Sequence, residues 1–216
     1  GVCVAFNEAV KLATNKYIVL GHDDMYFCPN WDTVFMNELQ LIKEKDFFLS
    51  GIMVQRTNAD LILDCGSNYK DFNKNKLLDE LPKMQANDFQ GTHWQPSLLP
   101  ITTWQKVNGF SEEFSPGLGS DPDFNFKLWN IGVRLFKGLG NCRVYHFSSV
   151  SLRKKSWNNG AKTFLLKWGI SIKFFRKHYL KVNTIYDGPL KSPVKNFQYY
   201  TDLLKCKISF IYGRKL

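Results

Sequence analysis

Hydrophobic and polar positions alternate along the chain in blocks that have the lengths of strands and helices. Short apolar runs predict strands at residues 2–6, 17–20, 47–54, 133–136 and 143–147. Apolar residues at helical spacing predict helices over residues 7–15, 29–45, 103–108 and 121–131. Strands that alternate with helices indicate an α/β fold with a mixed, mainly parallel sheet flanked by helices.

Two segments differ from this alternation. Residues 55–92 are polar and irregular, too long for a bare connector, and predict an excursion that covers a substrate. Residues 159–180 predict a basic amphipathic helix, whose apolar stripe holds Phe164, Leu165, Trp168, Ile172, Phe175 and Tyr179. That stripe could lie in a membrane interface, or it could pack on the rest of the protein. The remaining chain is expected to be loop-like as far as residues 203–212.

Charge divides the chain near residue 150. The net charge is +10, but residues 151–216 hold 15 Lys or Arg against 2 Asp or Glu, whereas residues 1–150 hold 14 against 17. We therefore expect a core over residues 1–150 and a basic, mainly helical extension over residues 151–216. A basic extension suits phosphates or an anionic membrane surface, and a solvated face is the alternative.

Apolar runs and cysteines bear on location. No apolar run approaches the roughly 20 residues that a membrane span needs. The five cysteines are odd in number, widely spaced and without a CxxC pair, so they are expected to be small buried hydrophobes in a reducing compartment. We expect a cytoplasmic protein whose basic helix can contact the inner face of a membrane peripherally.

The first candidate for chemistry is YIVLGHDDM, residues 17–25. It places Asp23 and Asp24 at the carboxyl end of a buried strand, where open α/β sheets bind ligands. Adjacent carboxylates repel each other unless a cation intervenes, and Mg²⁺ or Mn²⁺ bound to a diphosphate would fill that role. The alternative is a helix N-cap or a solvated turn.

The second and third candidates lie later in the chain. In SPGLGSDPDFNFKLWNIG, residues 115–132, Ser120 or Asp121 is expected to cap a helix. Asp121 and Asp123 then lie in its first turn, where the helix dipole keeps a carboxylate ionised and able to act as a general base; ordinary capping is the alternative. His146, at a strand end in VYHF, could complete a metal site with Asp24 or be structural.

Taken together, these motifs resemble family 2 glycosyltransferases. The resemblance rests on Asn7, HDDM, Pro29-x-Trp31, WQPSLLPITTWQKVNGFSEEFSPGLGSDPDF, VYHF and NNG…FLLKWGISIKFF, and it covers residue 1 to about residue 180. It implies a GT-A-like, Rossmann-like fold. The family's first strands, which carry the aspartate that reads the nucleotide base, would precede residue 1, so an N-terminally truncated chain is expected.

The resemblance also implies roles for individual residues. Asp24 would bind Mn²⁺ or Mg²⁺, His146 would reach the metal or the diphosphate, and Asp121 would be the general base. The implied substrate-binding residues are Asn7, Asp23, Trp94, Gly117, Gly119, Ser120 and Asp123. Two positions depart from the family pattern, because His22 stands where many members have an acid and Ser120 replaces the usual Glu.

The implied activity is metal-dependent, inverting transfer of a hexosyl group. The donor would be a UDP- or GDP-sugar and the acceptor a hydroxyl of a glycan, in the synthesis of surface polysaccharide. The alternatives are a non-catalytic sugar- or nucleotide-binding relative and a basic nucleic-acid-binding protein. The latter leaves the Asp pairs unexplained and lacks a recognisable binding motif, so no specific nucleic acid is expected. A phosphoesterase would need more His and Asp ligands.

Overall fold

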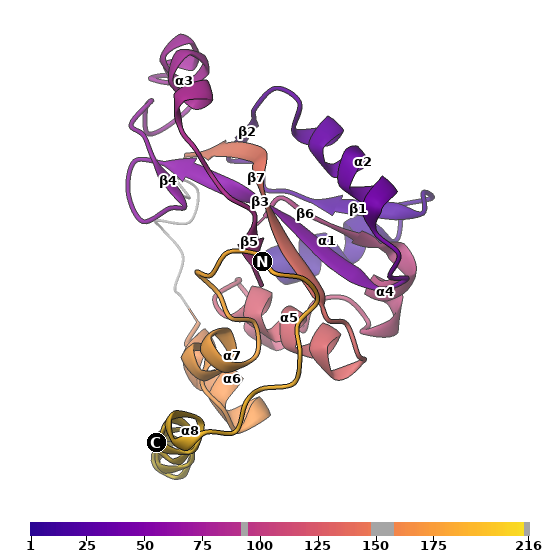
Figure 1. Ribbon diagram of the computed structural model, residues 1–216, viewed down its shortest axis with the longest axis vertical. Helices are drawn as coiled ribbons and strands as arrows, with labels where there is room; N and C mark the ends of the chain where they lie inside the picture. Colours follow the sequence, from indigo (N-terminus) through magenta and orange to yellow (C-terminus); the bar gives the residue numbers. More distant parts are fainter. Residues whose placement is uncertain (92–94, 148–157, 214–216) are drawn as a thin grey trace.

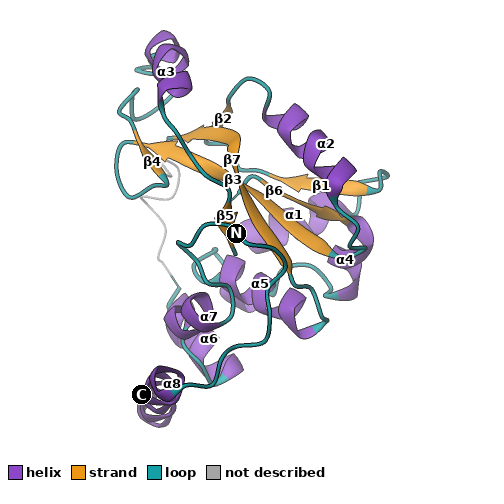
Figure 2. Ribbon diagram, viewed as in Figure 1, coloured by secondary structure: helices purple, strands orange, loops and turns teal. Residues whose placement is uncertain are grey.

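The computed structural model describes residues 1–91, 95–147 and 158–213. Its centre is a seven-stranded sheet with helices on both faces (Figures 1 and 2). The strand order is β1-β6-β3-β7-β2, with β4 paired to β3 and β5 paired to β7. The strands are β1 Tyr17–Leu20, β2 Met25–Phe27, β3 Phe47–Gln55, β4 Leu61–Ile62, β5 Phe89–Gln90, β6 Ser97–Pro100 and β7 Leu135–His146.

The predicted α/β class and mixed sheet are confirmed, but the sheet is not mainly parallel. Among the described strands, β3 runs parallel to β7 and β4. The four other pairings, β1 with β6, β2 with β7, β3 with β6 and β5 with β7, are antiparallel. Sequence patterns find individual strands but do not fix their relative directions, since these depend on long-range pairing.

The central strand β3 is buried on both faces, which explains its nearly continuous apolar sequence. On one face Phe48 packs with Phe124 and Phe136 in the largest core cluster. On the other face Phe47 and Leu49 pack against Phe35 of helix α2 (Trp31–Leu41). The alternation of side chains along the strand therefore supplies both layers.

One continuous strand, β7, replaces the two strands predicted at residues 133–136 and 143–147. It pairs with β3 along its length, with a shift of register between Ser50 and Ile52. Gly140 is needed inside this strand, because a Cβ there would lie 2.4 Å from the carbonyl oxygen of Ala86. Gly140 thus marks a close approach of two backbone segments inside a single strand.

The amino-terminal prediction was wrong. Instead of a strand over residues 2–6 followed by a helix over 7–15, the chain forms one helix, α1 (Val2–Val10). Val2, Phe6 and Val10 are four residues apart, so they lie on one helical face, and all three pack against the largest cluster. That spacing outweighs the β-propensity of the short valine-rich run.

The polar segment 55–92 contains regular elements, so its predicted irregularity is not confirmed. It includes β4, α3, the short helix η1 and β5. The remaining helices are α3 Lys74–Glu80, η1 Leu81–Lys83, α4 Ile101–Lys106, η2 Glu112–Phe114, α5 Ser120–Asn130, α6 Gly160–Trp168, α7 Ile172–His178 and α8 Phe197–Gly213. The single helix expected over residues 159–180 is two helices, because Gly169 adopts a φ of 71° and ends α6.

The carboxyl-terminal helices share a core with the sheet layer. Phe164, Phe174 and Phe175 are buried in the cluster that also holds Trp104 and Phe124. The apolar stripe of α6 and α7 thus packs on the rest of the protein, which was one of the two interpretations of the sequence. It does not face outward as a membrane-bound stripe would. The expected boundary near residue 150 falls outside the described residues.

The five cysteines are free and buried, as expected of small hydrophobes. Desolvation raises the pKa of the Cys28 thiol to about 12, so it remains protonated. None of the helices in the described ranges combines the length and the apolar character that crossing a bilayer requires.

Candidate functional site

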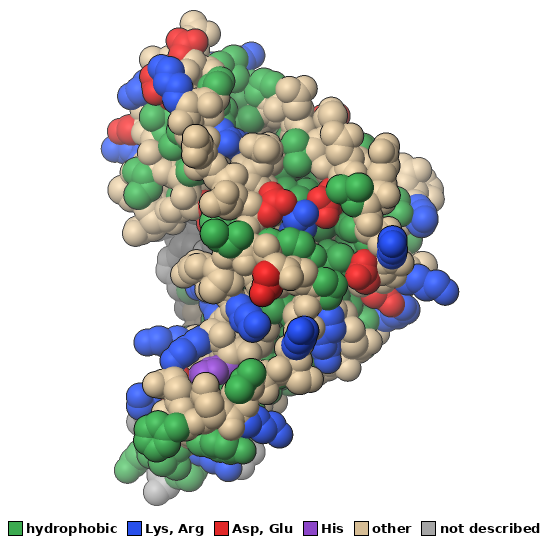
Figure 3. All heavy atoms as spheres, in the orientation of Figure 1, with side chains coloured by type: hydrophobic (Ala, Val, Ile, Leu, Met, Phe, Trp, Pro, Cys, Tyr) green, Lys and Arg blue, Asp and Glu red, His purple; other side chains and the backbone are tan. Residues whose placement is uncertain are grey.

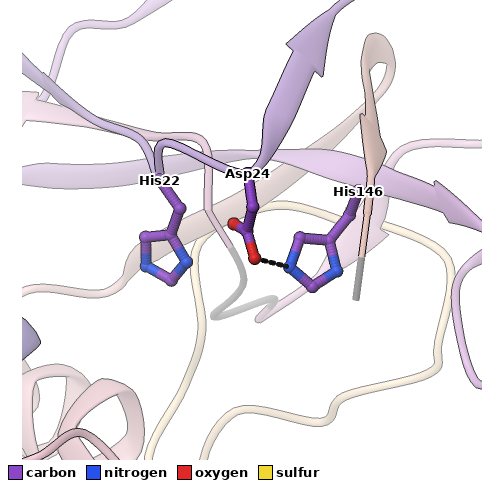
Figure 4. A group of neighbouring side chains, drawn as sticks. All are labelled: His22, Asp24 and His146. Carbon is purple, nitrogen blue, oxygen red and sulfur yellow. Dashed lines mark ion pairs between the residues drawn. The ribbon is translucent and has the colours of Figure 1, made fainter. Parts of the chain in front are cut away.

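Three side chains from separate elements meet at one edge of the sheet. His22 follows β1, Asp24 precedes β2 and His146 ends β7, and Figure 4 shows them pointing into the same space. One potential ligand atom from each lies within 4.8 Å of the other two. His146 Nε2 lies 3.3 Å from Asp24 Oδ2, and all three residues are partly exposed. The cluster therefore has the spacing and the access that a bound cation requires.

Backbone pairing holds the cluster together. Strand β2 runs antiparallel to β7 with Met25 opposite His146, which brings the preceding Asp24 beside that histidine. The Phe147 amide also donates a hydrogen bond of 3.0 Å to the Asp24 carbonyl. The register of the β2–β7 ladder, rather than the local sequence, thus joins two residues far apart in the chain.

Gln55 orients the His146 ring. Its Nε2 donates to the carbonyl oxygens of Thr57 and Asn58, which turns Oε1 toward the histidine. His146 Nδ1 lies 2.8 Å from that oxygen, and because an amide oxygen can only accept, Nδ1 carries the proton. In the neutral ring, Nε2 then presents a lone pair to the side of the cluster, which is the arrangement typical of metal-binding histidines.

The donor set fits a divalent cation. A neutral Nε2 and a carboxylate oxygen at 3.3 Å are both acceptors, so a proton or a cation between them would relieve their repulsion. Two imidazoles with one carboxylate suit Mn²⁺ better than Mg²⁺, which prefers oxygen ligands and keeps its waters. His22, Asp24 and His146 are accordingly the residues that would hold the ion.

Asp121 lies in the first turn of α5, as the sequence predicts. Gln95 Nε2 donates a 2.7 Å hydrogen bond to its Oδ1. Burial raises the pKa of the Asp121 carboxyl, while the bond from Gln95 and the charge of nearby His22 oppose that rise. His22 therefore links the candidate base to the cluster electrostatically, because it belongs to the cluster and its charge acts to lower the pKa of Asp121.

The loop before α5 is shaped by close contacts. Gly119, not Ser120 or Asp121, is the N-cap, with a φ of 86°. Ser120 is buried in the first helical turn, and its hydroxyl donates to the Gly117 carbonyl at 2.7 Å. A Cβ on Gly160 would lie 1.8 Å from the Leu118 carbonyl, so this loop and α6 meet backbone to backbone. A substrate role for Gly117, Gly119 and Ser120 stays a prediction.

Two predicted substrate-binding residues have structural partners within the protein. The Asn7 amide donates to the Phe110 carbonyl and accepts from the Phe110 amide, each at 2.9 Å, and so joins α1 to the segment after α4. Asp123 is fully buried, and its Oδ1 accepts from Trp168 Nε1 at 2.8 Å and pairs with Lys167 at 3.0 Å. A fully buried carboxylate is not open to a substrate, so we assign Asp123 to the attachment of α6.

Two other predicted substrate-binding residues, Asp23 and Trp94, are not part of the cluster that the structure describes. Asp23 is exposed and outside the three-residue cluster, and Trp94 lies outside the described residues. Sequence reasoning treated His22 as a departure, although its position two residues before Asp24 could have signalled a shared face of the turn. Gln55 and Gln95 carried no signal, because each acts only through a distant partner.

Comparisons of the sequence with protein-family models and with curated proteins find no match.

Proposed function

We propose that the protein is an inverting glycosyltransferase that uses a nucleotide-sugar donor and a divalent cation, preferably Mn²⁺. One observation carries the proposal: His22 belongs to the cluster with Asp24 and His146, and its charge also acts on the Asp121 carboxyl. A candidate site for a diphosphate-binding cation and a candidate base are therefore linked electrostatically through His22. An acceptor hydroxyl placed between them would face the base on one side and the anomeric carbon on the other.

The chain's residues have distinct roles in this mechanism. His22, Asp24 and His146 would hold the cation, which when bound supplies positive charge to a diphosphate leaving group. Asp121 accepts the proton of the acceptor hydroxyl while the hydroxyl oxygen forms a bond to the anomeric carbon. The bond from that carbon to the diphosphate oxygen breaks, and its electron pair leaves with the nucleotide diphosphate. A single displacement of this kind inverts the anomeric configuration.

The environment of Asp121 supports its role as base. Burial raises the pKa of this carboxyl above the ordinary aspartate range, which makes it a stronger base. The Gln95 hydrogen bond holds one oxygen and leaves the other for the acceptor. From the motif resemblance, we take the acceptor to be a glycan hydroxyl in surface polysaccharide synthesis.

Nucleotide binding provides the first test. UDP and GDP are titrated into the protein by calorimetry with and without Mn²⁺, alongside Asp24→Ala and the control Asp79→Ala, an exposed aspartate on α3. We expect binding of one nucleotide that requires Mn²⁺, is lost in Asp24→Ala and persists in the control. Binding that ignores both Mn²⁺ and the loss of Asp24 would contradict the metal site.

Turnover separates an enzyme from a non-catalytic relative. Release of nucleotide diphosphate from a panel of UDP- and GDP-sugars is followed by phosphorus NMR, with water or oligosaccharides as acceptors. We expect Asp121→Asn to lower the rate by about 10²–10⁴-fold and to leave nucleotide affinity nearly unchanged. A wild-type protein that binds nucleotide but consumes no donor would favour the binding relative.

A further inference from the structure

Helix α8 carries two opposite apolar faces. One faces the protein, where Tyr199 and Cys206 are buried and Leu203 packs against the core. The other, which we call the outer stripe, is 47–84% exposed and consists of Phe197, Tyr200, Leu204, Ile208, Ile211 and Tyr212. Single exposed apolar residues are ordinary, but six on one helix form a continuous surface that marks an interaction site.

Helical periodicity explains this arrangement. The residues of the outer stripe recur at intervals of three and four, so they share one side of the helix over its whole length. In Figure 1, α8 lies at the end of the molecule away from α3, and Figure 3 shows apolar side chains gathered at that end. The outer stripe thus lies at an extremity, where an extended flat surface could reach it.

Positive charge surrounds the outer stripe. Lys205 and Lys207 are exposed, and their places in the helical repeat put them on opposite edges of the stripe. Residues 191–216 hold six Lys or Arg and a single Asp, a net charge of +5. That residue, Asp202, pairs with Lys177 of α7 at 2.8 Å and with His178 at 3.0 Å, and the largely exposed Lys205 lies 3.7 Å from its other oxygen. Its charge is therefore compensated within the protein.

A basic hollow adjoins α8. A cavity of about 590 Å³ lies against α7 and the segment after it, and its charged lining residues are Lys173, Arg176, Lys177 and Lys181. Lys177 also holds Asp202, so the cavity lies next to α8. The apolar stripe and the cations around it present the two features that an anionic lipid surface recognises, apolar area for the acyl boundary and cations for the phosphates.

We propose that α8 docks the protein on the surface of an anionic lipid bilayer. The outer stripe enters the boundary between headgroups and acyl chains, and Lys205 and Lys207 extend to the phosphates on either side. Charge favours this occupant over a second copy of the chain, because apposed outer stripes would bring lysine-rich edges together. The inference concerns α8 alone and does not depend on the catalytic proposal.

Vesicle co-sedimentation tests the docking. The full 216-residue protein is mixed with vesicles of phosphatidylcholine alone, or with vesicles that also contain about 30% phosphatidylglycerol, which makes their surface negative. Ile208→Glu is compared with Ser209→Glu, which adds the same charge at the next, exposed position off the stripe. We expect the wild type to prefer anionic vesicles, Ile208→Glu to bind at least about tenfold more weakly, and Ser209→Glu to change little.

A second variant tests the lysines. Lys205→Gln/Lys207→Gln keeps the outer stripe, and we expect its affinity for anionic vesicles to fall about thirtyfold, at roughly fivefold per lysine. Unfolding temperatures of all variants show whether the fold is retained. Equal binding of Ile208→Glu and Ser209→Glu would overturn the proposal, as would a wild type that ignores anionic vesicles. The proposal would also be overturned if light scattering showed a dimer without lipid and Ile208→Glu disrupted that dimer. The outer stripe would then be a contact between two copies of the chain.

Discussion

Gln55→Met should weaken Mn²⁺ binding although Gln55 is not a ligand. In the wild type, Gln55 Oε1 lies 2.8 Å from His146 Nδ1 and keeps the ring proton on that nitrogen. The lone pair of Nε2 is thereby directed toward Asp24. Methionine is close in length but accepts no such bond, so the ring can rotate or carry its proton on Nε2. The ligand nitrogen is then correctly presented for only part of the time.

The expected size follows from two estimates. Loss of one hydrogen bond costs about 0.5–1.5 kcal/mol, which corresponds to a roughly 2- to 12-fold change in affinity. Loss of a partner behind a metal-binding histidine typically lowers metal affinity by about 10–100-fold. The two ranges overlap near tenfold, which is our expected rise in the Mn²⁺ dissociation constant.

Electron paramagnetic resonance of free Mn²⁺ provides the assay. Gln40→Met, at an exposed position of α2, makes the same substitution away from the cluster and should bind Mn²⁺ as the wild type does. The backbone of residue 55 pairs with Ile62 of β4, and a side-chain substitution leaves that backbone pairing possible, so the end of β3 should persist in Gln55→Met. A Gln55→Met protein that folds and binds Mn²⁺ as tightly as Gln40→Met would refute the reasoning about His146.

Three further predictions concern stability and pH. Because burial raises the folded-state pKa of Asp121, the wild type should lose stability as pH rises from about 4 through that pKa. Asp121→Asn should therefore have a higher melting temperature than the wild type at about pH 7 but not at about pH 4. Equal differences in melting temperature at the two pH values would contradict the raised pKa. Phe175→Ala should cost about 3–5 kcal/mol in urea unfolding and preserve one transition, because this fully buried ring packs on Phe126 and Phe164 in the shared core; separate transitions would show independent units. Asp123→Asn should lower the free energy of unfolding by roughly 1–3 kcal/mol, because Lys167 loses its buried charged partner and keeps Glu113 at 2.6 Å, while nucleotide binding in calorimetry stays unchanged. A stable variant that fails to bind nucleotide would return Asp123 to the site.

Local patterns predicted several elements well. The apolar runs at residues 17–20 and 47–54 are strands β1 and β3, and the segment from Ser120 forms helix α5, whose end is marked by Gly132 at a φ of 97°. These signals are local because period, capping and glycine conformation act within a few residues. The same locality misled at the amino terminus, where the short run of residues 2–6 read as a strand although the spacing of Val2, Phe6 and Val10 is helical.

The sequence by itself determined the α/β class, the mixed nature of the sheet and the candidate residues Asp24, Asp121 and His146. For the apolar stripe of α6 and α7 it left two interpretations open, one of them the burial that the structure shows. The tertiary structure decided which of these act together. Register between β2 and β7 joins Asp24 to His146, the end of β3 brings Gln55 to that histidine, and packing of α6 removes Asp123 from the open site. Each of these contacts spans tens of residues, and such pairings leave no periodic trace in the sequence around either partner.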